Sequence, residues 1–128
     1  MRLRLDTHAF LWFVTDDPRL GAVAKSSIQD SANQRLLSAA CLWEMAIKFS
    51  FGKLKLAKPF ATLIPEQLAA NSIEILPIQL SHIEAVAGLP FHHRDPFDRM
   101  LIAQAIVEGI GLLSAEAAID AYGVKRIW

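Results

Sequence analysis

The sequence has little cysteine, little charge and no excess of either sign of charge. Its 128 residues include one cysteine, Cys41, so no disulfide can form within the chain, as is typical of proteins from reducing compartments. Thirteen basic and thirteen acidic residues cancel to a formal net charge of +0. A basic coat that would bind nucleic acid over the whole surface is therefore excluded. Any affinity for phosphate must come from local charge or from a metal.

Long apolar runs and low-complexity tracts are also missing. No stretch is apolar enough to span a membrane, and the first residues reach Asp6 before any apolar segment of signal-peptide length. We therefore expect a cytoplasmic protein. Hydrophobic residues make up 53% of the chain, which is enough for a full core. We find no linker or repeat and expect one domain over residues 1–128.

Several common catalytic motifs do not occur. There is no phosphate-binding glycine loop, no dinucleotide-binding fingerprint and no nucleophile elbow. His92 and His93 are adjacent, without nearby cysteine or helical His spacing, which disfavours a zinc site. We interpret them as loop residues. An aspartyl-phosphate phosphatase would need an acid two residues after Asp6, where this chain has His8.

Strand-like and helix-like segments alternate along the chain. Strands are expected at "LRLDT", "RLLSA", "IEILPI", "GLLSA" and "VKRIW". Helices are expected at "HAFLWFVT", 20–30, "AACLWEMAIKFSFG", 60–71, "SHIEAVAGLP", 95–108 and "AAIDAYG". The fifth of these helices should open with a capping box from Ser81 to Glu84. The alternation predicts an α/β fold with a parallel sheet covered on both faces. Ligands of such sheets bind beyond the carboxyl ends of the strands, where Asp6 and Ser114 are expected.

Two acidic residues stand next to apolar sequence that should be buried. Glu44 lies within "SAACLWEMAIK", where an ion pair with Lys48 would contribute only about 0.3–0.5 kcal/mol. That is less than the several kcal/mol that burying an unpaired carboxylate costs. We therefore favour a functional role for Glu44, as a partner of a bound cation. Asp6, between Leu5 and "AFLWF", is either the N-cap of the next helix or part of a half-buried pocket.

Two aspartates open the helix at 95–108. Asp95 before a proline has the pattern of an N-cap residue followed by proline at the first helical position. Asp98 either complements the helix dipole, for about 0.3–1 kcal/mol, or has a functional role. We favour the functional role because Leu101 follows at i+3 and the polar side of the helix is expected at Gln104 and Glu108.

The candidate acids are best explained as one cation-binding group. Carboxylates gathered in a poorly hydrated site repel one another, and Mg²⁺ or Mn²⁺, which prefer oxygen ligands, would relieve that repulsion. Asp6, Glu44 and Asp98 are the candidates, and Glu116 is evenly balanced between ligand and first-turn acid. A basic run is interpreted equally as a phosphate contact or as a solvated face; it comprises Lys48, Lys53, Lys55 and Lys58.

Over essentially its whole length the chain resembles the PIN-domain toxins of the VapC type. The segments that carry the resemblance are "LDTHAFLWF", "SAACLWEMAIKFSFGKLKL", "HHRDPFDRMLIAQA" and "LLSAEAAIDAYGV". It implies a PIN-like three-layer α/β/α domain with a parallel, roughly five-stranded sheet. It also implies a toxin–antitoxin ribonuclease that cleaves single-stranded or looped RNA with water activated by Mg²⁺ or Mn²⁺. Whether one or two ions act stays open.

The resemblance assigns roles by position. Catalytic and metal-binding roles fall to Asp6, Glu44, Asp98 and Glu116, and supporting roles to Asp95, Ser114 and Thr7. RNA contacts are expected from Lys48, Lys53, Lys55, Arg94 and Arg99. The family often has threonine, any residue and aspartate where this chain has Ser114 and Glu116, so we expect the longer Glu116 to act through a metal-bound water, or only weakly, and not as a tight direct ligand.

The family further implies a homodimer and a cognate VapB-type antitoxin. Candidate antitoxin contacts are Trp12, Phe13, Trp43, Phe49 and Phe51, most of which fit the core equally well. The alternative function is a PIN-like module that binds RNA or an antitoxin with weak or no catalysis. The departure from the family's pattern at Glu116 would favour this alternative. The presence of the family's other three acids, Asp6, Glu44 and Asp98, argues against it.

Overall fold

The computed structural model describes residues 1–128 and contains a five-stranded sheet in the order β3-β2-β1-β4-β5. All four pairs of neighbouring strands are parallel. The strands are β1 (Arg2–Leu5), β2 (Gln34–Ser38), β3 (Ile73–Leu76), β4 (Gly111–Leu113) and β5 (Arg126–Ile127). The fold class expected from the alternation of strands and helices is confirmed.

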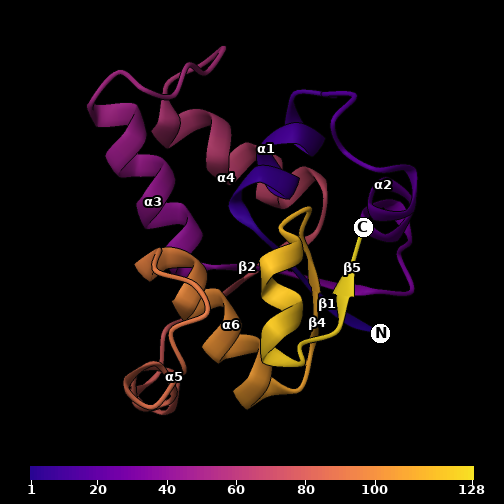
Figure 1. Ribbon diagram of the computed structural model, residues 1–128. Helices are drawn as coiled ribbons and strands as arrows, with labels where there is room; N and C mark the ends of the chain where they lie inside the picture. Colours follow the sequence, from indigo (N-terminus) through magenta and orange to yellow (C-terminus); the bar gives the residue numbers. More distant parts are fainter.

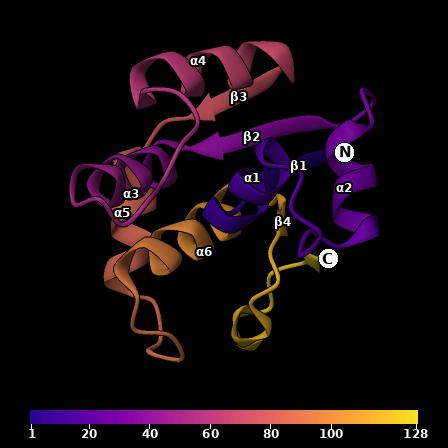
Figure 2. The ribbon, with the colours of Figure 1, turned by 90° about the horizontal axis from the view of Figure 1, so that it is seen from above.

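Helices cover both faces of this sheet (Figures 1 and 2). They are α1 (Thr7–Val14), α2 (Ala22–Gln29), α3 (Ala39–Ser50), α4 (Phe60–Ala70), α5 (Leu80–Ala87), α6 (Pro96–Glu108) and the 3₁₀-helix η1 (Ala117–Tyr122). Each lies in a segment predicted to be helical, with ends shifted by a few residues. None of the helices combines the length and the apolar character needed to cross a bilayer.

Successive side chains of a strand point to opposite faces of the sheet, so the hydrophobic core is divided between these two faces. Leu3 and Leu5 of β1 pack with α1 to α4, through Phe10, Ile28, Met45 and Ile64 among others. On the opposite face, Leu112 of β4 packs with Ile102 of α6 and Ile119 of η1. Cys41 is 1% exposed within the first cluster, as expected of a small core residue.

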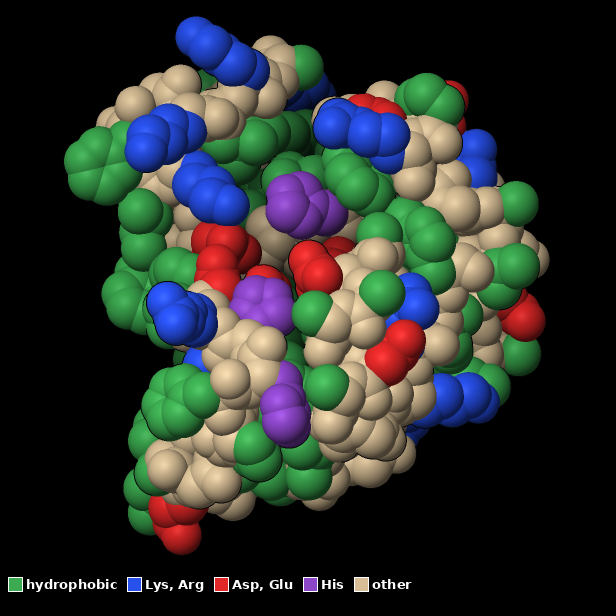
Figure 3. Space-filling view, viewed as in Figure 1, with side chains coloured by type: hydrophobic (Ala, Val, Ile, Leu, Met, Phe, Trp, Pro, Cys, Tyr) green, Lys and Arg blue, Asp and Glu red, His purple; other side chains and the backbone are tan.

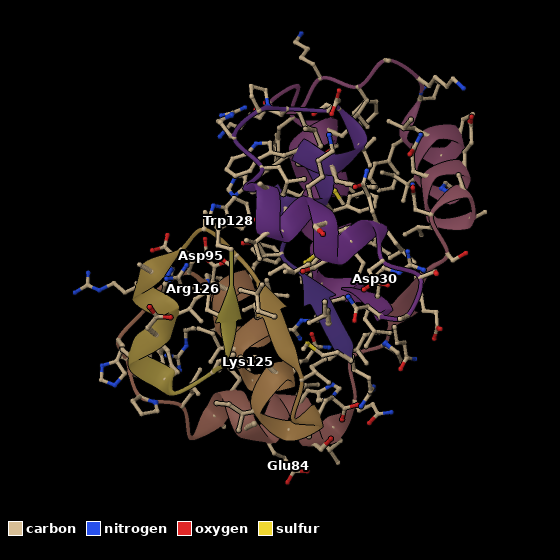
Figure 4. The ribbon with its side chains drawn as sticks, turned by 90° about the vertical axis from the view of Figure 1, so that its right-hand side faces the viewer. Asp30, Glu84, Asp95, Lys125, Arg126 and Trp128 are labelled. Carbon is tan, nitrogen blue, oxygen red and sulfur yellow. The ribbon has the colours of Figure 1, made fainter.

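The strand order changes direction at β1. From β1 the chain adds β2 and β3 on one side, and later β4 and β5 on the other. Asp6 follows β1 directly, and its N–H donates to Leu113 O of β4 at 3.0 Å. Ligands of parallel sheets bind at such a switch point. β5, with Arg126 and the following Trp128, forms one edge of the sheet (Figure 4).

The predicted capping box of α5 is wrong. The helix begins at Leu80, so the N-cap is Gln79 and not Ser81. His82 Nδ1 accepts the Gln79 N–H at 3.0 Å, which is the role expected of Glu84 three residues into the helix. The hydrogen-bonding side chain at the third helical position is therefore a histidine.

The predicted polar side of α6 is also wrong at Gln104. This side chain is 0% exposed, because its Oε1 accepts from Nη1 of the buried Arg4 at 2.8 Å. A polar residue on α6 thus faces the sheet, paired with a cation of the central strand. Glu108 does lie at the surface, with its side chain 24% exposed.

Candidate active site

A small polar pocket of about 120 Å³ opens at the ends of β1 and β4. None of its eight lining residues is hydrophobic: they are Asp6, Thr7, His8, Glu44, Lys48, Asp95, Asp98 and Glu116. Acidic side chains gather at the centre of this face of the molecule, with basic side chains beside them (Figure 3). The fold thus brings together all the acids that sequence analysis singled out.

Asp6 serves both as a helix cap and as a wall of this pocket. Its Oδ1 accepts the Ala9 N–H at 2.7 Å as N-cap of α1, and the residue is 7% exposed. Burial raises the pKa of the Asp6 carboxyl, an effect that the Ser114 hydroxyl and the Ala9 N–H partly offset. The two interpretations of Asp6 are therefore not exclusive.

Glu44 projects from α3 and has two protein partners. Its Oε1 accepts from Thr7 Oγ1 at 2.6 Å, and its Oε2 from Lys48 Nζ at 3.0 Å. The Glu44 side chain is 12% exposed, but that of Lys48 is 42% exposed, so solvent weakens the ion pair. Thr7 and Lys48 together hold the carboxylate at the wall of the pocket.

Asp95 has the predicted N-cap role, and Asp98 lies in the first turn of the same helix. Asp95 is the N-cap of α6 and accepts the N–H groups of Phe97 at 2.8 Å and Asp98 at 3.2 Å. Asp98 lines the pocket one turn later, and burial raises the pKa of its carboxyl to about 6. The negative charge of Asp95 adds to this rise, as do Glu44 and Asp6. The acids are therefore close enough to repel one another.

His93 belongs to the site although the sequence alone indicates only a loop residue. Its Nδ1 accepts the Asp95 N–H at 3.2 Å, so a neutral ring carries its hydrogen on Nε2. That atom lies 3.3 Å from Asp98 Oδ2. The only signal in the sequence is the position of His93 two residues before the N-cap.

Glu116 is the most weakly held acid of the pocket. It caps η1, where its Oε1 accepts the Ala118 N–H at 3.3 Å, and its own N–H donates to Ser114 Oγ at 3.0 Å. The residue is exposed. Its carboxylate lines the pocket from the solvent side, whereas Asp6 does so from the sheet.

The donor set of the pocket suits a hard cation. All candidate ligands are carboxylates, which Mg²⁺ and Mn²⁺ prefer. The raised pKa values of Asp6 and Asp98 reflect unfavourable negative charge that a cation would relieve. No three acidic, histidine or cysteine side chains form a ready-made chelate. The carboxylates instead turn toward Thr7, Lys48 and His93.

A larger groove adjoins the acidic pocket, and we name it the basic groove. It has a volume of about 510 Å³ and shares Thr7, His8 and Lys48 with the pocket; its other lining residues include Trp12, Asp17, Arg19, Lys53 and Lys55. Lys58 is not among them and pairs with Glu66 at 3.0 Å. The basic run of the sequence is therefore split in space.

Arg99 was expected to contact RNA but is buried in the structure. It is 5% exposed, and its guanidinium donates to the carbonyl oxygens of Pro90 at 2.9 Å and Leu89 at 3.0 Å. Phe91 lies 4.0 Å from the same group. The prediction for Arg99 is wrong because this cation is used to hold the loop before α6. Arg94 is exposed, and its RNA contact stays a prediction.

Fold and site define a parallel α/β domain with an oxygen-donor centre where the strand order changes. The chain belongs to the PIN domain family, whose model matches residues 4–125. It is similar to Ribonuclease VapC16 of Mycobacterium tuberculosis (strain ATCC 25618 / H37Rv), with 36% identity over 69 residues. That match covers 51% of this chain and 49% of the relative, so the chain spans about half the length of the curated relative it matches.

Solved structures share the fold over nearly the whole chain. VapBC2 from Rickettsia felis, bound to a promoter DNA fragment, gives a TM-score of 0.74 at 15% identity and covers 99% of this chain and 98% of that one. VapBC-1 from nontypeable Haemophilus influenzae gives a TM-score of 0.68 at 14% identity and covers 99% of this chain and 97% of that one. FitAcB from Neisseria gonorrhoeae gives 0.64 at 15% identity, with 98% and 96% covered.

Proposed function

We propose that this chain, as a single PIN domain, is the VapC-type ribonuclease toxin of a toxin–antitoxin pair. It would cleave RNA phosphodiester bonds by water activated by Mg²⁺ or Mn²⁺. The observation that carries this proposal is the meeting of Asp6, Glu44 and Asp98, from three separate elements, in one wholly polar pocket. The likeness to a relative named as a ribonuclease and to VapBC structures supports it.

Asp6 and Asp98 would hold the ion, with Glu44 and, less tightly, Glu116. When bound, such an ion supplies an activated water and stabilises developing negative charge on phosphate. The chain's own residues keep the acids in place. Thr7 donates to Glu44 at 2.6 Å, and the Ala9 N–H orients Asp6 at 2.7 Å. Asp95 and Ser114 support the helix and strand ends beside them.

The basic groove gives the RNA a path to these acids. Lys48, Lys53 and Lys55 line it, and such side chains bind phosphates without reading sequence. Arg94, on the exposed loop before α6, would add a further phosphate contact. Single-stranded or looped RNA fits best, because its backbone bends and its bases are free to turn outward.

The same proposal includes a VapB-type antitoxin and a homodimer, acting in the cytoplasm where cellular RNA lies. Three of the five aromatic candidates for antitoxin contact are exposed: Trp43 at 62%, Phe49 at 37% and Phe51 at 74%. All three lie on α3 or directly after it. Trp12 and Phe13 instead pack partly against the core, which favours the α3 aromatics as the partner surface.

Cleavage of a labelled single-stranded RNA by the purified chain tests the function. We expect cleavage in Mn²⁺ or Mg²⁺, none in EDTA, and little or none in Asp98→Asn because a metal ligand is removed. Mn²⁺ should also raise the melting temperature through binding to the folded state. In an Asp6→Asn, Asp98→Asn double variant that rise should disappear. Full activity in Asp98→Asn, or an unchanged rise in the double variant, would place the metal elsewhere.

A further inference from the structure

His8 lies where the acidic pocket meets the basic groove and lines both. It is the second residue of α1 and is exposed. Every other residue that lines the acidic pocket is an acid, a threonine or a lysine. His8 is therefore the one side chain of that pocket with a flat aromatic surface, and the proposed cleavage reaction gives it no role.

The ring of His8 is part of a fixed stack. His8 and Trp12, four residues apart on α1, share one side of the helix, and their ring centroids are 5.4 Å apart with the planes inclined by 28°. The Arg19 guanidinium carbon lies 4.9 Å from the Trp12 ring centroid, and Trp128 packs edge-on against Trp12 at 5.8 Å. Trp12 is thus held by contacts from two other parts of the chain.

Arg19 forms a bidentate ion pair with Asp17. Its Nε and Nη2 donate to the two carboxylate oxygens of Asp17 at 3.1 Å and 2.7 Å. The row from Asp17 through Arg19 and Trp12 to His8 is therefore organised before any ligand arrives. A surface ordered in advance costs less conformational entropy on binding than a flexible one.

We infer that His8 is the stacking platform for an unpaired base next to the phosphate at the acidic pocket. This inference rests on the proposed ribonuclease function and names the part of the substrate that His8 would recognise. The acids and any bound cation engage the phosphate, and the lysines of the basic groove engage its neighbours. A base beside that phosphate would find an aromatic surface at His8. Stacking tolerates any base but requires that the base is unpaired.

The test uses the Asp98→Asn variant, which we expect to bind RNA without cleaving it, and four single-stranded uridine tetranucleotides. Each carries the fluorescent base 2-aminopurine at a different position. Stacking quenches 2-aminopurine, so we expect strong quenching at one position. His8→Ala in the same background should abolish that quenching and weaken binding roughly 5- to 160-fold, the range for removal of one base–aromatic stack.

Two matched variants separate stacking from charge. His8→Phe keeps an aromatic surface and cannot carry a charge, so it should retain both affinity and quenching. His8→Lys supplies a positive charge without a ring and should lose both. The opposite result, retention in His8→Lys and loss in His8→Phe, would overturn the platform and make His8 a phosphate contact. Unchanged binding in all variants would overturn it too. A reference variant that binds none of the probes would overturn the ribonuclease proposal as well.

Discussion

Asp98 carries a negative charge in an unfavourable place. Its side chain is 32% exposed, and burial together with the charge of Asp95 raises the pKa of its carboxyl to about 6, from an ordinary value of 3.8. Between these two values the folded protein binds more protons than the unfolded chain. Stability therefore falls as the pH rises from about 4 to about 6. Above that range, the full cost of the charge is present.

Asp98→Asn should relieve this cost in metal-free buffer. Its gain in unfolding free energy should be near zero at pH 4, grow up to pH 6 and stay constant above, at up to about 2 kcal/mol after allowance for partial exposure. Urea denaturation at pH 4 to 8 in EDTA measures it. Asp120→Asn is the control: the pKa of exposed Asp120 is lowered by its hydrogen bonds with Arg126. That substitution should cost stability at neutral pH. A gain at pH 7 no larger than at pH 4 would contradict the burial of charge at Asp98.

Glu116 should matter less than Asp98 for cleavage. It is exposed, and its carboxylate accepts a single hydrogen bond, from the Ala118 N–H at 3.3 Å. Its longer side chain also has an extra rotamer to fix. We expect Glu116→Gln to lower single-turnover cleavage less than Asp98→Asn does, across a Mn²⁺ titration. Glu116→Asp should be tolerated and bind Mn²⁺ at least as well. Equal damage from the two amide substitutions would make Glu116 an essential ligand.

At the level of elements, α6 is fastened to the centre of the sheet by a buried cation. Arg4 of β1 is 0% exposed; it donates from Nη1 to Gln104 Oε1 at 2.8 Å and from Nη2 to Leu101 O. Burial lowers the pKa of the guanidinium to about 10. Because Asp6 directly follows β1 and Asp98 lies in the first turn of α6, this contact helps to fix the relative position of two acids of the site.

Replacing only Gln104 in the hydrogen bond between Arg4 and Gln104 should lower the unfolding free energy more than replacing both residues. Gln104→Leu leaves the buried Arg4 with only the Leu101 carbonyl and should lower the unfolding free energy by about 3 kcal/mol. Arg4→Met combined with Gln104→Leu replaces the polar contact by apolar packing and should lower it by less. Urea denaturation of the two single variants and the double variant gives the coupling energy. A double variant less stable than Gln104→Leu alone would show that the contact is a net stabiliser.

Across the whole molecule, charges that cancel in number are separated in space. The formal net charge is +0, yet an acidic pocket and the basic groove lie side by side and share three residues. The acids would repel RNA phosphates without a cation, and the groove would attract them. A neutral total charge is therefore compatible with RNA binding along one path.

Lys53 and Lys55 should carry part of this attraction. In the Asp98→Asn background, Lys53→Ala with Lys55→Ala should weaken binding of single-stranded RNA and lower the dependence of log affinity on log salt by about 0.7 for each phosphate that is no longer neutralised. Fluorescence anisotropy over a salt titration measures both effects. Lys58→Ala is the matched control, since Lys58 pairs with Glu66 outside the groove. An effect of Lys58→Ala as large for each charge removed, half that of the double variant, would mean that overall charge, and not the groove, attracts the RNA.

The sequence by itself determined the elements and the acids. Alternation of strands and helices predicted the parallel sheet, the proline after Asp95 predicted the N-cap, and an apolar run around Glu44 indicated an acid with a special role. These features depend on neighbours within a few residues, because periodicity, capping and the burial of a helix side are local properties. The convergence of the acids followed from them, since parallel strands end at one edge of the sheet.

Only the tertiary structure decided which polar side chains are buried and which lie together. Gln104 can be buried because it accepts a hydrogen bond from Arg4, which lies 100 residues away in the chain. Arg99 can be buried because the loop before α6 supplies carbonyl oxygens that accept its hydrogen bonds. His8 joins the pocket to the groove because α1, α3 and the segment after α3 meet there. A polar group stays in the interior only where distant parts of the chain supply its hydrogen-bond partners, and no local pattern specifies those partners.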